Sequence, residues 1–352
     1  MDVDALLQAM LEAEASDLHL KVGRPPIFRV YGQLIPQNKW PPLTVDDLEG
    51  ALRHLASEEQ LAAFARSHEL DFAYTLGKDG RFRVNIGRQQ GTLYFTLRAI
   101  RSAAPTLAEL GLPQVCADLA MKPQGLALVT GPTGSGKSTT LAAMVEHINR
   151  MAARRIITIE DPVEYLFTDQ RSVITQREVG GDTHSFAAAI KYALRQDPDV
   201  IMVGEMRDLE TIAAALTAAE TGHLVLATLH TPSAPEAIDR VVDVFPSHQQ
   251  AQVRTQLAMT LAGVLAQRLV MRADGDGRVA ACEVMVGTGA VRNLIREGKT
   301  AQMISAIQTG RDVGMQTLNQ ALFDLYRRQF ITWDEALLQS GDVAGLKQLG
   351  GR

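Results

Sequence analysis

The chain carries at residues 126–139 the stretch Leu126-Ala127-Leu128-Val129-Thr130-Gly131-Pro132-Thr133-Gly134-Ser135-Gly136-Lys137-Ser138-Thr139. An apolar run that leads into G-x-x-x-x-G-K-[ST] predicts a buried strand, then a phosphate-binding loop, then a helix. Glycines let backbone N–H groups approach phosphate oxygens closely, and the first turn of a helix adds partial positive charge. The motif therefore predicts nucleotide binding by residues 131–139, with Lys137 on the β- and γ-phosphates and Ser138 as a ligand of Mg²⁺.

Strands and helices alternate on the C-terminal side of this loop. Apolar runs predict strands at 156–159, 200–203 and 224–229, and the segments between them have helical patterns. That alternation is typical of a parallel sheet with crossover helices, so we expect an α/β domain. From about residue 247 onward the pattern is mainly helical, with a hairpin expected at Gly275 and Gly277.

The first hundred residues predict a smaller α+β domain with a mixed sheet. Helical spacing over 4–13 changes to strict alternation at 17–22, and a second helix is expected over 44–65. The short segment Ser102-Ala103-Ala104-Pro105 predicts a hinge. We therefore divide the chain into domains at 1–101 and 113–352, joined by a linker at 102–112. Further strands are expected at 27–34, 70–76, 81–88 and 92–100.

Acidic side chains follow two of the predicted strands. One strand leads into Glu160-Asp161-Pro162-Val163-Glu164, and another into Gly204-Glu205. Ligands of open α/β sheets bind at the carboxyl ends of the strands, which favours a catalytic role for these groups. We interpret Glu164 as the base that orients water, and Glu205 as part of the Mg²⁺ shell, directly or through a water. For Glu160 and Asp161, capping of the turn beside Pro162 is an alternative.

His230 ends the apolar run at 224–229. The pattern predicts that it lies level with Glu205, where it would sense the γ-phosphate, although a lone histidine also suits a structural role. For His223, which precedes the same run, the two interpretations are equally open.

Composition narrows the class of protein and its compartment. The 352 residues have a net charge of −5, and no basic stretch with interleaved aromatic residues suggests nucleic-acid binding. The only cysteines, Cys116 and Cys282, provide no disulfide framework or zinc cluster and favour a reducing compartment. No apolar stretch reaches the roughly 20 residues of a membrane span, and no export signal is visible. We expect a cytoplasmic protein without direct membrane insertion.

These motifs together resemble the secretion-type hexameric ATPases, and within them the PilT family, the retraction ATPases of type IV pili. The resemblance covers nearly the whole chain, and Gly204-Glu205 in place of a Walker B aspartate-glutamate pair is itself the family pattern. The segments that carry it are Ala15-Ser16-Asp17-Leu18-His19-Leu20, the phosphate loop, an acidic box at 159–165, a Walker-B-like run at 197–208 and a histidine box at 221–231.

Two features resemble retraction rather than assembly or secretion ATPases. The four-cysteine zinc insert of those relatives is missing, and residues 290–297 read Ala-Val-Arg-Asn-Leu-Ile-Arg-Glu, close to the A-I-R-N-L-I-R-E motif associated with retraction. The tail at 314–346 also resembles the accessory retraction paralogue, so both paralogues stay open.

The resemblance implies a homohexamer in which a PAS-like N-terminal domain is joined flexibly to a RecA-like domain, with ATP between them. It implies arginine fingers from the N-terminal domain, for which Arg83 and Arg98 are the foremost candidates and Arg81 a third. It further implies Mg²⁺-dependent ATP hydrolysis that drives pilus retraction and twitching motility against an inner-membrane platform protein, alone or with a paralogous retraction ATPase.

Three other functions compete with this interpretation. A DNA translocase would share the α/β domain, but the acidic chain lacks a basic binding stretch. A small-molecule kinase would need a lid-like arginine cluster after the loop, which the sequence does not show. A non-catalytic accessory ring subunit would bind nucleotide and mainly dock to a partner motor, and the intact Lys137, Glu164 and Glu205 argue against it while leaving low turnover open.

Overall fold

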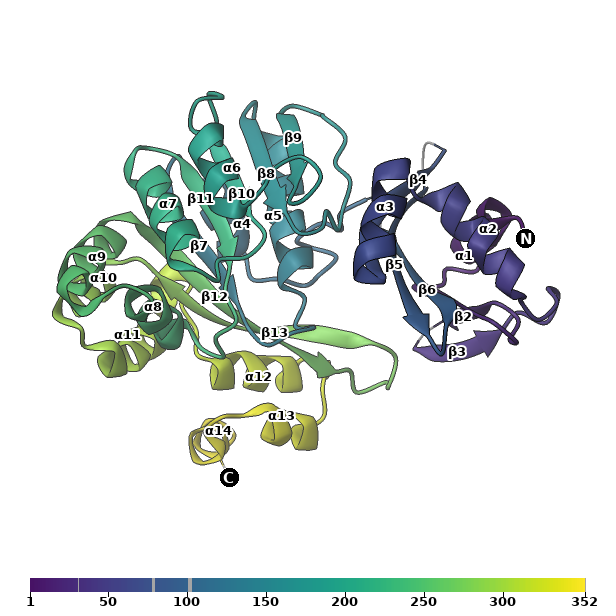
Figure 1. Ribbon diagram of the computed structural model, residues 1–352. Coiled ribbons are helices and arrows are strands. Elements are labelled where there is room, and N and C mark those ends of the chain that lie inside the picture. The colour runs from purple at the N-terminus through teal and green to yellow at the C-terminus, as the bar shows by residue number, and fades with distance from the viewer. Residues whose placement is uncertain (31, 78–79, 101–102, 352) are drawn as a thin grey trace. The chain divides into compact units, whose positions relative to one another are not determined.

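The computed structural model describes residues 1–30, 32–77, 80–100 and 103–351 (Figure 1). The chain divides into two compact units, one formed by Met1–Ala103 and Glu164–Leu166, the other by Ala104–Val163 and Phe167–Arg352. Ser102, at the start of the expected linker, lies outside the described residues. The hinge and the domain limits at 101 and 113 stay predictions.

The first unit is a sheet with strand order β3-β2-β1-β6-β5-β4, in which every neighbouring pair is antiparallel. The expected mixed sheet is therefore wrong. Most strands follow one another through short turns, and such connections join antiparallel neighbours. The strands are β1 (Asp17–Lys21), β2 (Ile27–Val30), β3 (Gln33–Pro36), β4 (Glu69–Leu76), β5 (Gly80–Gln89) and β6 (Thr92–Ile100).

The helix expected over 44–65 is two helices. After α1 (Val3–Glu12) and the first strands, α2 (Val45–Leu55) ends before Ser57, and α3 (Glu58–Ser67) begins there. The Ser57 hydroxyl accepts from the backbone N–H of Gln60, and the Gln60 side chain accepts from the N–H of Ser57. This reciprocal capping box satisfies two helix-end donors, which makes a new start more favourable than one continuous helix.

The second unit is built on a sheet with order β13-β12-β7-β11-β10-β8-β9, parallel except for the β12–β13 pair. It confirms the expected α/β fold. The hairpin at Gly275 and Gly277 is also present, with arms longer than expected. The strands are β7 (Gly125–Thr130), β8 (Arg155–Glu160), β9 (Val173–Glu178), β10 (Val200–Val203), β11 (Leu224–Thr228), β12 (Leu261–Met271) and β13 (Arg278–Val286).

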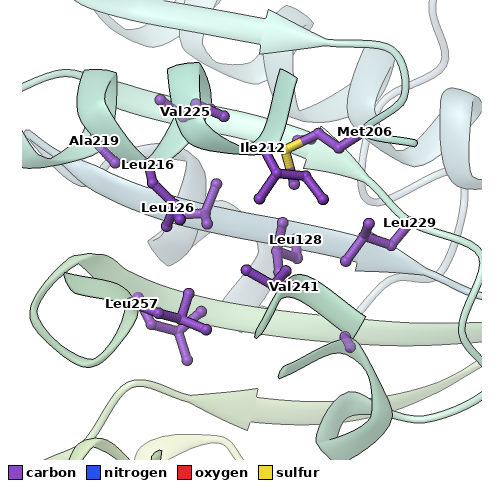
Figure 2. Close-up of a cluster of buried hydrophobic side chains, with 14 of the residues drawn as sticks. Leu126, Leu128, Met206, Ile212, Leu216, Ala219, Val225, Leu229, Val241 and Leu257 are labelled. Atoms are coloured by element: carbon purple, nitrogen blue, oxygen red, sulfur yellow. The ribbon is translucent and has the colours of Figure 1, made fainter. Parts of the chain in front are cut away.

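Helices cover both faces of this sheet. Leu126 and Leu128 of β7 pack on one face in the cluster of Figure 2, together with Leu216, Val241 and Leu257 from three helices. The alternate β7 side chains belong to a second cluster on the other face. A strand buried on both sides reads as one continuous apolar run, as 126–130 does. The helices are α4 (Val115–Ala120), α5 (Lys137–Met151), α6 (Phe186–Ala193), α7 (Leu209–Glu220), α8 (Ala234–Asp243), α9 (Ser247–Thr260), α10 (Gly289–Glu297), α11 (Met303–Thr309), α12 (Leu318–Arg327), α13 (Trp333–Gln339) and α14 (Val343–Leu349).

Parallel pairing decides where the site forms. Because β7, β11, β10 and β8 are parallel neighbours, their carboxyl ends share one edge of the sheet. The phosphate loop, His230, Glu205 and Glu160 follow or end these strands, so the fold gathers them there. Within the described ranges, no helix combines the length and apolar content needed to cross a membrane.

Candidate nucleotide site

The phosphate loop takes a shape that requires glycine. Gly131 has φ +144°, and a Cβ there would lie 2.2 Å from the carbonyl oxygen of Gln267 and 2.7 Å from Ser135 Oγ. Gly136, at φ +86°, is left-handed just before α5 begins at Lys137. The loop therefore turns back over β12 so closely that only a residue without a side chain fits at 131.

Lys137 lies inside this loop. Its side chain is largely buried, and Nζ donates to the carbonyl oxygens of Gly131 (2.9 Å) and Pro132 (3.0 Å). The same nitrogen lies 3.5 Å from Nδ1 of His230. The ammonium is thus held at the mouth of the loop, next to the residue that ends the neighbouring strand.

The carboxylate of Glu205 contacts His230 and Arg207. Nε2 of His230 is 2.8 Å from Oε1 of Glu205, and Nε of Arg207 donates to the same oxygen. Burial raises the pKa of Glu205, but the Arg207 hydrogen bond and the electrostatic contributions of His230 and Arg207 outweigh it and leave the pKa below its usual value. Glu205 is therefore an ionised carboxylate at neutral pH.

A pair of threonines fixes His230 beside the loop. Thr130 Oγ1, at the end of β7, donates to the carbonyl oxygen of Thr231 (2.7 Å) and accepts from its N–H (2.8 Å). His223 precedes β11, at the strand's opposite end, with Nδ1 3.0 Å from the carbonyl oxygen of Ala218. The structural interpretation therefore holds for His223, whereas His230 lies with Lys137 and Glu205.

The acidic side chains at the end of β8 and just after it have different surroundings. Glu160 is buried and accepts from Thr158 Oγ1 (2.7 Å) and Gln176 Nε2 (3.2 Å), so it ties β8 to β9. Glu164 is exposed, and its segment groups with the first unit. The role of Glu164 as the base stays a prediction.

The candidate arginine fingers lie on one face of the first unit's sheet. Arg83 and Arg98 are paired across β5 and β6. Arg98 Nε donates to Oδ1 of the buried Asp17 (2.8 Å), and Arg83 Nε donates to Oδ1 of the exposed Asp71 (3.3 Å). The arginine side chains are 67% and 46% exposed, which leaves both accessible. Their role, and that of Arg81 on β5, stays a prediction.

Gln267 is a residue of the site that the sequence reasoning missed. Its side chain is 3% exposed, Nε2 donates to the carbonyl oxygen of Ser135 (2.7 Å), and Oε1 accepts from Thr140 Oγ1 (2.7 Å). It thus supports the loop and the first turn of α5 from beneath. The available signal was an amide that directly follows residues 261–266 of β12, which lack polar side chains.

We expect Gln267→Leu to weaken nucleotide binding, because the carbonyl of Ser135 and the hydroxyl of Thr140 both lose a buried partner. Each orphaned group costs about 1–3 kcal/mol, so nucleotide affinity should fall by roughly tenfold or more, with a lower melting temperature. Titration with a fluorescent ATP analogue and thermal unfolding measure the two effects. Gln308→Leu, at an exposed glutamine, is the control, and equal affinities for both variants would contradict the assignment.

The residues present fit a nucleotide with Mg²⁺. A cavity of about 440 Å³ opens beside the loop, and the loop supplies backbone N–H groups, an ammonium and the hydroxyl of Ser138. Mg²⁺ prefers one or two protein oxygens together with substrate phosphates, and the assignment of Ser138 and Glu205 as those donors stays a prediction. The cavity is lined by Pro132, Thr133, Gly134, Ser135, His230, Pro232, Arg268, Leu269, Arg278 and Gln339.

A strand, loop and helix of this geometry at the carboxyl edge of a parallel sheet define a P-loop nucleotide-binding protein. Residues 94–293 match the family described as Type II/IV secretion system protein. The chain is 48% identical to the type IV pilus retraction ATPase PilT of Pseudomonas aeruginosa, over 96% of this chain and 97% of that protein. It is 41% identical to the type IV pilus ATPase PilU of the same bacterium, over 99% and 91%.

A solved structure of the pilus retraction motor PilT with bound ADP is similar over 99% of both chains, with a TM-score of 0.93 and 44% identity. The chain therefore belongs to the Type II/IV secretion system protein family and, within it, to the PilT family of ATPases. The resemblance drawn from the motifs is confirmed.

Proposed function

We propose that this ATPase is a motor subunit that drives retraction of type IV pili. The observation that carries the proposal is the convergence of Lys137, Glu205 and His230 beside the phosphate loop, in a chain whose retraction relative matches over nearly its whole length. A P-loop site of this kind performs catalysis mainly by positioning phosphates and stabilising their charge.

The site residues have different roles in hydrolysis. Lys137 binds the β- and γ-phosphates through its ammonium, and His230, beside it, contacts the γ-phosphate. Ser138 and Glu205 hold Mg²⁺, which when bound neutralises charge on the phosphates. Glu164 orients the attacking water and accepts its proton.

The proposed assembly is a homohexamer, in which Arg83 and Arg98 act on the nucleotide of a neighbouring subunit. A guanidinium offers a planar fork to the γ-phosphate. In both arginines the hydrogen bond to the neighbouring aspartate uses Nε. Alternating nucleotide states would move the two units at the linker. The ring would act from the cytoplasm on an inner-membrane platform protein of the pilus machine.

The accessory paralogue is the second candidate. The identity of 48% to PilT, against 41% to PilU, favours the main motor. Residues 290–297, which resemble the motif associated with retraction, form most of α10, with Val291 and Ile295 buried and Asn293 and Glu297 exposed. The exposed face of α10 is available to a partner.

Removal of Mg²⁺ should stop hydrolysis. We expect purified protein to have the mass of a hexamer of the 38.3 kDa chain in light scattering, and to release phosphate from ATP. EDTA should abolish that release and added Mg²⁺ restore it, because Ser138 and Glu205 would lose the cation they share with the phosphates. A ring that binds nucleotide without turnover would favour the accessory role.

The cellular function is tested by deletion of the gene in its own host. Cells without it should keep surface pili and lose twitching, and the wild-type gene should restore twitching while the Lys137→Ala gene should not. Unchanged twitching in the deletion strain would contradict the proposal.

A further inference from the structure

A carboxylate outside the site connects two helix starts. Glu283 lies on β13, and its Oε1 accepts from the backbone N–H of Ala234 (2.7 Å), the first residue of α8. The backbone N–H of Leu318, the first residue of α12, lowers the pKa of the same carboxyl group, although burial raises that pKa overall. One side chain thus receives the leading N–H groups of two helices from distant parts of the chain.

A capping side chain at each helix start satisfies a donor further along the first turn. In α8, Ser233 Oγ accepts from the N–H of Glu236, and Pro235 has no N–H to offer. In α12, Thr317 Oγ1 accepts from the N–H of Gln320. The helix caps therefore leave the first N–H of each helix to Glu283. Burial raises the pKa of Glu283, and the N–H groups of the two helix starts oppose that rise.

The start of α8 is also the end of the segment that carries His230. Thr130 fixes this segment at Thr231 and Glu283 fixes it at Ala234, so only Pro232 and Ser233 lie between the two attachments. The first attachment comes from the strand that leads into the phosphate loop, and the second comes from β13. The position of His230 relative to Lys137 and Glu205 therefore depends on both.

We propose that Glu283 is a positioning residue for His230, which clamps the start of α8 to β13 and joins the nucleotide site to the C-terminal helix α12. The inference rests on the proposed role of His230 in contacting the γ-phosphate. Glu283 does not touch the nucleotide and acts through the backbone of residues 231–234. Its loss displaces His230 while the phosphate loop, supported by Gln267, keeps its shape.

Glu283→Gln tests the proposal with little change in volume. The amide keeps one acceptor oxygen and turns an NH₂ group toward the other helix start, so at least one N–H loses its partner. A small displacement of a group at the reacting centre lowers turnover by roughly ten- to a hundredfold. We expect kcat for ATP to fall by about tenfold, with KM and the affinity for a fluorescent nucleotide within about twofold of wild type.

A double-mutant cycle separates positioning from general damage. If Glu283 acts through His230, then adding Glu283→Gln to His230→Gln should lower kcat by less than about twofold further. An additional tenfold loss in the double mutant would overturn the proposal, as would normal turnover of Glu283→Gln. Normal turnover of His230→Gln would instead overturn the proposed role of His230.

Gln316→Ala is the matched control for the C-terminal attachment. Gln316 Nε2 donates to the carbonyl oxygen of Cys282 (2.8 Å), so the variant loosens the chain before α12 without touching Ala234. We expect its kcat to stay within about twofold of wild type. A loss equal to that of Glu283→Gln would show that docking of α12 alone matters and would contradict the proposal. If Glu283→Gln does not fold, Glu283→Asp, which retracts the charged oxygens by one methylene, takes its place with the same expected outcomes.

Discussion

Lys137→Ala should abolish nucleotide binding and lower ATP turnover by roughly 10³-fold, because it removes the ammonium that the loop holds for the phosphates. Lys137 Nζ bonds to two loop carbonyls and lies against His230, so the fold fixes its positive charge at the mouth of the loop. Phosphate release and nucleotide titration measure both effects.

The control for this variant is Lys191→Ala, which removes an exposed lysine from α6 in the same unit. It should bind nucleotide and turn it over as wild type does. If Lys137→Ala retains wild-type affinity, the loop does not bind phosphate as we infer. Thermal unfolding of the variant distinguishes a lost contact from a lost fold.

Glu164→Gln should bind ATP with unchanged affinity and hydrolyse it more slowly by roughly 10²- to 10⁴-fold, the contribution of a general base. The amide has the shape of the carboxylate but cannot accept a proton from water. Single-turnover hydrolysis and nucleotide titration separate the chemical step from binding.

Two variants make the Glu164 experiment specific. Asp161→Asn changes another exposed carboxylate of the same acidic segment and should retain turnover. Glu205→Gln tests the rival base, since Glu205 lies 2.8 Å from His230. If Glu205→Gln stops hydrolysis with binding intact and Glu164→Gln does not, Glu164 is not the base.

Local sequence patterns were sufficient to predict the phosphate loop, the strand before it and the helix after it. The run 126–139 combines an apolar strand, glycines at left-handed positions and a helix start, and each signal lies within a few residues of the next. Glu205 and His230 could be placed beside it because parallel strands end at a common edge.

Other features depended on contacts that no local pattern records. The edge strand β9 was missed because it has few apolar residues and lacks a buried run. Gln267 and Glu283 act through partners more than thirty residues away in sequence, so their identities as polar residues did not reveal their function. The arginines were recognised as candidates by resemblance, and their partners Asp17 and Asp71 became visible only through strand register.

The two sheets also imply an order of events during synthesis. In the first unit most neighbouring strands are consecutive hairpins, so their pairing can form soon after each strand leaves the ribosome. In the second unit β7 pairs with β12, which is translated more than a hundred residues later. Until β12 arrives, the phosphate-loop sequence exists without Gln267 beneath it. The nascent chain therefore gains the capacity to hold nucleotide late, after most of the protein has been made.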